Sequence, residues 1–382
     1  MRNAGAYFRS WFGRFERLTW RSPDPWLCLP AGALLALGAL MVLNTTYFLG
    51  QEKTGDPFHF FVLHLVHIAA GLMLCALLSQ FSLAGLRRIA LPLGVIAVAL
   101  LIAVWIPGMG VVRGGARRWV RLGPLLAEPS EVLKFALVFF LAEFLARRRD
   151  VIHRFERGPL PVFAIVAPVA LLVLRQPDFG TTVMIALILF AMLFAAGARL
   201  AHLGEAGGGV LALLTIQAVA KPYRMRRLTA FLNPWGTARG AGFQLIQSFI
   251  ALGDGGGWGQ GLGAGRQKMF YLPQAHTDFV FAVVAEDFGI AGAIVVFALF
   301  ATILFRGMRI AHEEPDPFAS LLAVGLTSLL SLQALINMAV VIGLVPTKGL
   351  PLPFVSYGGT SILMALGTLG ALLALSRRPA VR

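Results

Sequence analysis

A cluster of polar side chains at the mouth of an apolar run is where this sequence first suggests chemistry. The stretch YLPQAHTDFVFAVVAEDFG places His276, Thr277 and Asp278 directly before the apolar residues that begin at Phe279. A polar cluster at the mouth of a membrane helix is placed to meet a substrate on the solvent side. Asp278, with His276 and Thr277 beside it, is therefore a candidate to contact a substrate.

Two further acids lie inside the apolar run itself. Glu286 comes eight residues after Asp278, about 12 Å along a helix at 1.5 Å per residue, and Asp287 follows it. Acids within a membrane segment are functional candidates by default. The alternative is that they pair with polar groups of neighbouring helices. That alternative is favoured for Asp287, and both readings stay open for Glu286.

Cations and an aromatic side chain form a second group. In GARRWVRLGPLLAEPSEVLKFAL, the adjacent Arg117 and Arg118 could bind an anion, and Trp119 could pack against a sugar or an acyl chain. Glu131 and Lys134 are three residues apart and share one helix face. An ordinary ion pair explains Glu131 and Lys134 well, whereas an interfacial belt fits the RRW triplet poorly.

Two more stretches carry isolated polar residues. In RQPDFGT, Asp178 could cap a helix or serve the function, and the sequence leaves both readings open. In VPTKGLPLPFVSYGGTS, three prolines and three glycines predict irregular backbone, which membrane proteins tolerate only when it is buried or lines a cavity. Lys348 is the sole charge in this stretch and a plausible anion contact, and Ser356 is a further candidate for substrate binding.

The elements that carry these residues follow from the composition. The chain is 58% hydrophobic and 13% charged, with a mean hydropathy of +0.77, whereas soluble domains are about half apolar and a quarter charged. We predict an all-α polytopic membrane protein with ten transmembrane helices, because apolar runs of this length can cross a hydrocarbon core of about 30 Å. The ten segments are 27–49, 58–80, 89–106, 131–146, 160–174, 179–197, 202–220, 278–305, 318–344 and 357–376.

The charge pattern predicts an orientation. The net charge of +15 indicates topology and contacts with lipid headgroups rather than nucleic acid, and basic short loops place both ends of the chain in the cytoplasm. Residues 1–26 then form a cytoplasmic amphipathic segment and residues 377–382 a cytoplasmic tail. Two basic loops, 107–130 and the large loop 221–277 between the seventh and eighth helices, lie outside. Either they bind an anionic ligand there, or their arginines reach individually to lipid phosphates.

Several motifs in this order resemble one known family. The stretches GARRW, PSE, PDFGT, NPW, GAGFQLIQS, GQGLGAGRQKMFYLPQAHTDFVFAVVAEDFG and PTKGLPLPFVSYGGTS together look like the SEDS family of shape, elongation, division and sporulation proteins, over residues 27–376. NPW, RQKMFYLP and PTKG are more similar to the division-type FtsW than to the elongation-type RodA. The resemblance implies a ten-span domain in the bacterial cytoplasmic membrane with its active site on the outer face. It also implies a peptidoglycan glycosyltransferase that polymerises lipid II, with a class B penicillin-binding protein and other divisome proteins as partners.

The resemblance also assigns roles to residues. Asp278 matches the essential aspartate of the HTDF motif and is the expected base, which takes the proton of the acceptor sugar hydroxyl. The expected stabilisers of the departing pyrophosphate match basic positions of the family, namely Arg117, Arg118, Lys134 and Lys348. A divalent ion such as Mg²⁺ could share that task, but the sequence shows no protein cage for one.

Three positions depart from the family pattern, and two other functions compete with the enzyme. Gln176 and Gln274 stand where glutamate is usual, and Glu128 stands where glutamine is usual, which puts charge-based roles at these positions in doubt. A lipid II flippase would need charges threaded across the membrane, and only Glu286 and Asp287 offer them in the inner half. A non-catalytic division scaffold would leave Asp278 dispensable.

Overall fold

Each of the ten predicted apolar segments corresponds to a helix. The computed structural model describes residues 23–113, 115–123, 125–219 and 222–377. The ten helices are α2 (Pro25–Thr54), α3 (His59–Ser79), α4 (Leu83–Ala103), α5 (Pro129–Ala146), α6 (Pro159–Arg175), α7 (Phe179–Ala195), α8 (Leu200–Val219), α11 (Val280–Glu313), α12 (Pro317–Val341) and α13 (Gly359–Ser376). The predicted amphipathic segment and cytoplasmic tail lie almost wholly outside the described residues, so those boundaries stay predictions.

The helices make this a multi-pass membrane protein. Within the described ranges, six helices are long and apolar enough to cross a membrane, namely α2, α3, α4, α11, α12 and α13. A seventh is possible if α8 and α9 (Pro222–Leu232), which meet at a bend of 100°, form one span. The count of ten spans therefore stays a prediction, since α6 and α7 have only 17 residues each.

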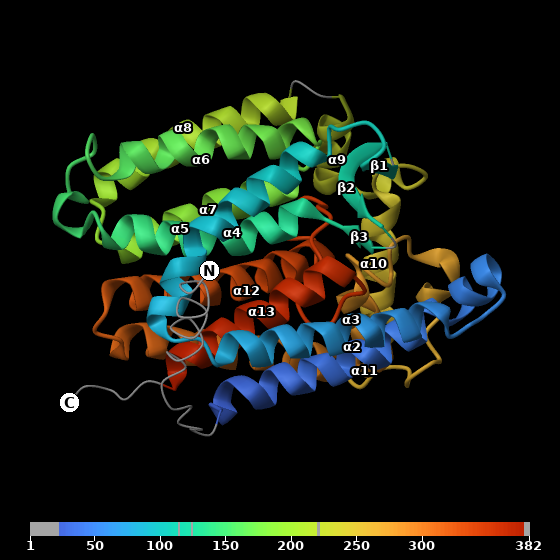
Figure 1. Cartoon of the computed structure of the whole chain (residues 1–382). Coiled ribbons are helices and arrows are strands. Elements are labelled where there is room, and N and C mark those ends of the chain that lie inside the picture. The colour runs from blue at the N-terminus through green and yellow to red at the C-terminus, as the bar shows by residue number, and fades with distance from the viewer. Residues whose placement is uncertain (1–22, 114, 124, 220–221, 378–382) are drawn as a thin grey trace.

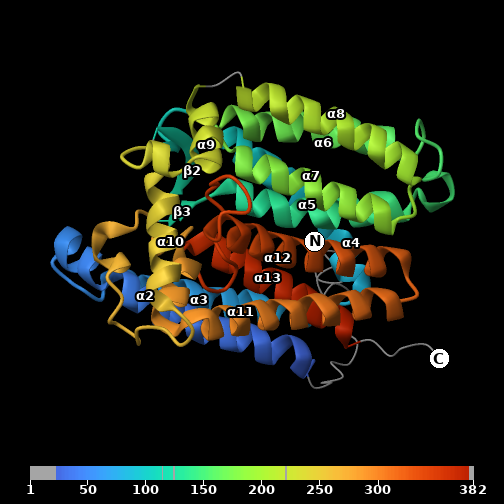
Figure 2. The ribbon, with the colours of Figure 1, turned by 180° about the vertical axis from the view of Figure 1, so that it is seen from behind.

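Helix α12 forms the centre of the bundle. It packs against α5, α7, α11 and α13, and it lies between them in both views (Figures 1 and 2). A helix that is apolar around most of its circumference has to be buried, and most of α12 is. Its few polar residues include Gln333 and Asn337, which are 4% and 2% exposed and therefore need partners inside the protein.

A small sheet interrupts the helices and was not predicted. Strands β1 (Gly110–Arg113), β2 (Ala116–Leu122) and β3 (Leu125–Ala127) form an antiparallel sheet in the order β1-β2-β3. Val111 pairs with Trp119 and Val112 with Arg117, so Arg118 is the extra residue of a β-bulge. Bulges re-aim side chains next to functional sites. The all-α prediction therefore holds for the apolar segments and is wrong for the loop 107–130.

The two basic loops gather at one end of the bundle. The sheet lies beside α9 and above α10 (Phe243–Gly255), at the right of Figure 1, and the rotated view agrees (Figure 2). Short turns complete this end and the opposite one, namely η1 (Arg149–Val151), η2 (Trp235–Thr237) and the π-helical turn η3 (Gln267–Tyr271). Both loops are therefore on the same face, as the charge pattern predicted.

The glycine-rich loop 253–265 is folded against α11. Gly289, with φ 69° and ψ −168°, breaks the helix, and loop backbone replaces the lost helical hydrogen bonds. Ile290 N donates to Gly256 O at 2.9 Å, and Gly261 N donates to Asp287 O at 3.0 Å. A Cβ at Gly259 would overlap the carbonyl of Asp287, so glycine is needed there for close backbone approach.

The acids inside α11 hold this loop in place. The Oε1 atom of Glu286 accepts hydrogen bonds from Arg266 N at 2.7 Å and Gln267 N at 3.2 Å. Asp287 accepts one from the Asn44 amide and lies 3.8 Å from Lys268 Nζ. Both acids are buried, with exposures of 0% and 1%. Asp287 thus pairs with a polar group of a neighbouring helix, Asn44 of α2, as favoured, whereas Glu286 pairs with loop backbone and its functional role stays open.

Replacing Glu286 with alanine should destabilise the protein. Two N–H groups would lose their acceptor, the buried one of Gln267 and the partly buried one of Arg266, and leaving a buried donor unsatisfied costs about 1–3 kcal/mol. Glu286→Gln keeps an acceptor oxygen and should lose clearly less. Thermal unfolding in detergent measures both variants against the unaltered protein. A Glu286→Ala protein that unfolds at the unaltered temperature would show that this contact contributes nothing to stability.

Candidate functional site

Asp278 lies two residues before α11, and its backbone is fixed by the core. Asn337 of α12 donates its amide to Asp278 O at 2.8 Å and to Leu350 O at 2.7 Å. This joins the segment before α11 to the loop 342–358. In that loop Gly349 approaches closely, because a Cβ there would lie only 2.8 Å from Asp278 Oδ2. The carboxyl group is thus held against bare backbone and is half-buried.

Burial raises the pKa of the Asp278 carboxyl to about 6. The positive charges of Arg227 and Arg118 oppose this shift, and the negative charge of Asp178 adds to it. A carboxylate with this pKa is mostly ionised at neutral pH but binds a proton more readily than an exposed aspartate does. These are the properties of a general base.

Lys348 supplies a cation in the same loop, next to Gly349. Its Nζ atom lies 5.0 Å from the centroid of the Phe179 ring, and its Cβ atom faces Gly180 at the start of α7. Loss of water lowers the pKa of Lys348 to about 8. Within the described residues the ammonium has no hydrogen-bonded acid, so it is available to an anionic ligand.

Arg118 joins the sheet to the start of α7. Its guanidinium donates to Gln176 O at 3.1 Å and to Pro177 O, and it lies 4.0 Å from Asp178 Oδ1. Asp178 caps α7, because its carboxylate accepts from Thr181 N at 3.1 Å and from Thr181 Oγ1 at 2.7 Å. Its negative charge also acts on Asp278, so the capping residue is part of the site.

Lys134 is buried in a hydrogen-bond network inside the protein. It is 1% exposed, and its Nζ atom donates to Glu131 Oε1 and to Gln333 Oε1, each at 2.6 Å. Gln333 in turn donates to Pro351 O at 2.8 Å. The expected ion pair is therefore present, and it supports the loop that carries Lys348. The predicted contact of Glu131 and Lys134 with a substrate stays a prediction.

His276 and Thr277 of the HTDF segment, together with Ser356, make internal hydrogen bonds, and their predicted contact with a substrate stays a prediction. Ser356 is 3% exposed, and its hydroxyl donates to Thr277 O at 2.5 Å and accepts from Leu352 N at 2.8 Å. Tyr357 N donates to His276 O at 2.9 Å. Burial, and to a lesser degree the charge of Lys53, lowers the pKa of His276 to about 4, so its ring is neutral at neutral pH. These bonds tie the segment before α11 to the start of α13.

Residues 25–380 match the FTSW_RODA_SPOVE family model, which is described as a cell cycle protein. The chain belongs to the FtsW/RodA/SpoVE family. The family expected from the motifs is thereby confirmed.

Relatives and solved structures of this family cover nearly the whole chain. It is 40% identical over 352 residues to the probable peptidoglycan glycosyltransferase FtsW of Geobacter sulfurreducens, covering 92% of this chain and 94% of that protein. It is 40% identical to stage V sporulation protein E of Bacillus subtilis, covering 93% and 97%. A structure described as "Structural coordination of polymerization and crosslinking by a peptidoglycan synthase complex" is similar with a TM-score of 0.76 and 33% identity, covering 94% and 98%. RodA of Thermus thermophilus is similar with a TM-score of 0.68 and 28% identity, covering 94% and 98%.

The three departures from the usual FtsW/RodA/SpoVE motifs have local explanations. Gln176 is buried and donates its amide to Leu101 O at 3.0 Å, which a carboxylate could not do. Gln274 Oε1 accepts from Thr277 Oγ1 at 2.9 Å, a role that a glutamate oxygen also fills. Burial, with the charges of Glu131 and Asp178, raises the pKa of Glu128 to about 8. Glu128 is therefore mostly uncharged at neutral pH, like the glutamine usual in the family.

Arg117 and Trp119 of the motif GARRW lie in the small sheet. Arg117 Nε is buried without a hydrogen-bond partner among the described residues, and it lies near Gly110 of β1. Trp119 pairs with Val111 in the sheet and is half-buried. The contact of Arg117 and Trp119 with a substrate stays a prediction.

Sequence reasoning did not single out four residues of this candidate site, although two of them belong to the basic loop 221–277 for which it allowed anion binding. Arg227 of α9 donates to Thr347 O at 3.2 Å, and its charge acts on Asp278. Arg224 lies 5.4 Å over the Phe179 ring. Their i,i+3 spacing indicates one helix face. Gln333 and Asn337 are also one turn apart, and two polar residues on one face of an apolar helix indicate a functional or structural contact there.

The candidate site holds few side chains of the kinds that bind metal ions. Within the described ranges, no group of three or more histidine, cysteine, aspartate and glutamate side chains could hold an ion. Both oxygens of Asp178 already accept hydrogen bonds from Thr181. A divalent ion would therefore need oxygens from a substrate, and the involvement of Mg²⁺ stays a prediction.

Proposed function

We propose that this protein is a peptidoglycan glycosyltransferase that polymerises lipid II into glycan strands during cell division. One observation carries the proposal, namely a half-buried carboxylate, Asp278, on which the charges of Arg118 and Arg227 act, with the cation Lys348 next to Gly349 in the loop that approaches it. The chain's similarity to proteins named FtsW supports it. A base beside cations is what an inverting sugar transfer from a diphosphate requires.

The reaction balances with these groups. The acceptor sugar hydroxyl attacks the anomeric carbon of the donor, whose bond to undecaprenyl pyrophosphate breaks with inversion. Asp278 takes the hydroxyl proton. Lys348 and Arg118 stabilise the negative charge that develops on the departing pyrophosphate. Arg117 and Lys134 are proposed to complete the cationic surroundings, with Arg117 on the sheet and Lys134 beneath the loop of Lys348.

The setting of the reaction is also a proposal. The site would face the outside of the bacterial cytoplasmic membrane, with both chain ends in the cytoplasm and the lipid tails entering from the bilayer. A similar chain belongs to a structure described as a peptidoglycan synthase complex, which supports a crosslinking partner. We propose a class B penicillin-binding protein, together with other divisome proteins. Transport is a weaker candidate, because the inner acids Glu286 and Asp287 are engaged by the loop and by Asn44.

The rate should depend on pH as a bell between about pH 6 and pH 8. Asp278 acts only when ionised, so kcat/KM should fall as pH drops through its pKa of about 6. Lys348 acts only when charged, so kcat/KM should fall as pH rises through its pKa of about 8. In Lys348→Arg the alkaline limb should vanish, since a guanidinium keeps its proton. An alkaline limb that survives this change would contradict the role of Lys348.

A polymerisation assay tests the proposed function. Purified protein is mixed with labelled lipid II in vesicles, with and without a class B penicillin-binding protein, and products are separated by length. Polymer that forms only when this protein is present is the expected result. The absence of polymer under both conditions would overturn the proposal.

A further inference from the structure

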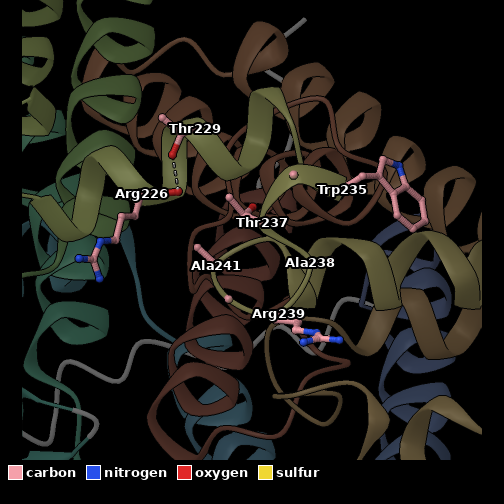
Figure 3. Close-up of a pocket in the computed structure, with 9 residues that line it drawn as sticks. Arg226, Thr229, Trp235, Thr237, Ala238, Arg239 and Ala241 are labelled. Atoms are coloured by element: carbon pink, nitrogen blue, oxygen red, sulfur yellow. Dashed lines mark hydrogen bonds between the residues drawn. The ribbon is translucent and has the colours of Figure 1, made fainter.

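An open hollow of about 650 Å³ lies in the loop 221–277, outside the site described above. Its lining residues are Arg226, Thr229, Trp235, Gly236, Thr237, Ala238, Arg239, Gly240 and Ala241. Figure 3 shows Arg226 and Trp235 on opposite sides of the loop, with Thr237 and Ala241 between them and Arg239 below. A ligand that reached from one side to the other would therefore be extended.

The hollow adjoins the candidate site across a single helix. On α9, Arg224 and Arg227 face the site, because they contact the Phe179 ring and Thr347 O. Arg226 and Thr229, on the same helix, line the hollow instead. Residues three apart share a helix face while adjacent residues do not. A polymer that leaves the reacting groups could therefore pass around α9 into the hollow.

The hollow is preformed by its own backbone. Gly236 N donates to Asn233 Oδ1 at 3.0 Å, and Thr237 N donates to Pro234 O at 3.0 Å. Gly242 N closes the loop by donating to Thr237 O at 3.2 Å. A Cβ at Gly242 would overlap Pro234 O, so the turn is tightly wound. A preformed loop costs a ligand little ordering entropy.

The lining has a distinct chemistry. Trp235 is 65% exposed, although a large aromatic ring normally buries its faces. Arg226 and Arg239 are exposed as well, two threonines supply hydroxyl groups, and none of the described lining residues is an acid. An exposed aromatic ring presents an apolar face to the C–H face of a sugar, hydroxyl groups hydrogen-bond to sugar hydroxyls, and guanidinium groups bind carboxylates in pairs of hydrogen bonds.

We propose that the hollow binds the nascent glycan strand, an oligosaccharide whose peptide branches carry carboxylates. This rests on the proposed function and adds a product-binding subsite to it. A sugar ring lies against Trp235, and branch carboxylates pair with Arg226 and Arg239. Holding the strand here keeps its end near Asp278 between additions, so the subsite sets how many sugars are added before release.

Product length tests the proposal separately from the reaction itself. Trp235→Ala and the double variant Arg226→Gln/Arg239→Gln should shorten the mean strand about three- to tenfold, as expected for losing an aromatic or arginine anchor. Their initial rates of lipid II consumption should stay within about twofold, since Asp278 and Lys348 are untouched. Trp258→Ala and Arg149→Gln are matched controls, because both side chains are exposed and lie outside the hollow. Unchanged strand length in both test variants would overturn the subsite, whereas an unaltered protein that makes no polymer would overturn the proposed function.

Lipid composition distinguishes a strand from a headgroup as the occupant. The assay is repeated in vesicles of phosphatidylcholine alone and in vesicles that also contain phosphatidylglycerol. Shortening of strands in both vesicle types is the expected result. Shortening confined to the anionic vesicles would mean that Arg226 and Arg239 bind lipid phosphates, and it would overturn the assignment to the glycan.

Discussion

Asp278→Asn lowers kcat for lipid II polymerisation by about 10²–10⁴-fold, the usual contribution of a general base. Asparagine has the size of aspartate but cannot take a proton from the acceptor hydroxyl. The backbone contacts of position 278 with Asn337 do not involve the side chain, so the protein should fold normally and still bind lipid II. Single-turnover polymerisation with labelled lipid II measures the loss.

Two comparisons make this result specific. Asp278→Glu should fail to restore activity, because the space a longer side chain would need beyond Oδ2 is occupied by the backbone at Gly349. Asp254→Asn is the matched control, since Asp254 is exposed and its side chain makes no contact at the site. Asp278→Asn activity equal to that of Asp254→Asn would refute the role of the carboxylate. It would favour the scaffold, for which Asp278 is dispensable.

The apolar part of the fold was predictable because it follows from one physical constraint. In lipid the backbone must satisfy its own hydrogen bonds, so long apolar runs become helices, and all ten segments did. The sheet at 110–127 escaped prediction because its strands are short and belong to a polar loop. The bulge at Arg118 is the most important detail. It interrupts the alternation of side chains along β2, so a regular strand pattern could not have predicted that Arg118 is the arginine that reaches Asp178.

The motifs that form the candidate site could be predicted from the sequence, but the contacts between their side chains could not. Four stretches far apart in sequence were expected to face one side, and the positions of Arg118, Asp178, Asp278 and Lys348 bring them together. Sequence spacing could not show that the Lys134 ammonium donates to both Glu131 and Gln333, because Gln333 is on another helix, α12.

The glycine-rich loop shows a different limit. Its composition is equally compatible with a flexible linker and with a ligand-binding turn, since glycine permits both. The break in α11 at Gly289 decides between the two, because it leaves backbone groups without helical partners. The loop backbone forms hydrogen bonds with these groups, so the loop is folded. Glu286 and Asp287 contact the residues that follow this loop, through the backbone of Arg266 and Gln267 and the ammonium of Lys268, and these contacts could not be predicted from sequence spacing.

Replacing Lys348 with methionine should lower kcat about 10²–10³-fold, comparable with removing one preorganised donor from a site that stabilises developing charge. The cation meets negative charge that grows as the pyrophosphate departs. Its loss should therefore reduce kcat more than it raises KM. Lys348→Arg keeps a positive charge and should retain more activity than Lys348→Met, although its planar group will not reproduce the point charge.

Thermal unfolding separates this loss from a loss of fold. Lys348 is half-buried, its ammonium lies near the Phe179 ring, and no salt bridge to it is found among the described residues. Desolvating a charge without a paired acid costs folding free energy, so Lys348→Met should unfold at the same temperature as the unaltered protein or a higher one. A protein that keeps or gains stability while it loses turnover is what a functional cation predicts. A Lys348→Met protein that unfolds much earlier, or that polymerises lipid II at the unaltered rate, would remove Lys348 from the mechanism and leave Arg118 and Arg227 as the cations beside Asp278.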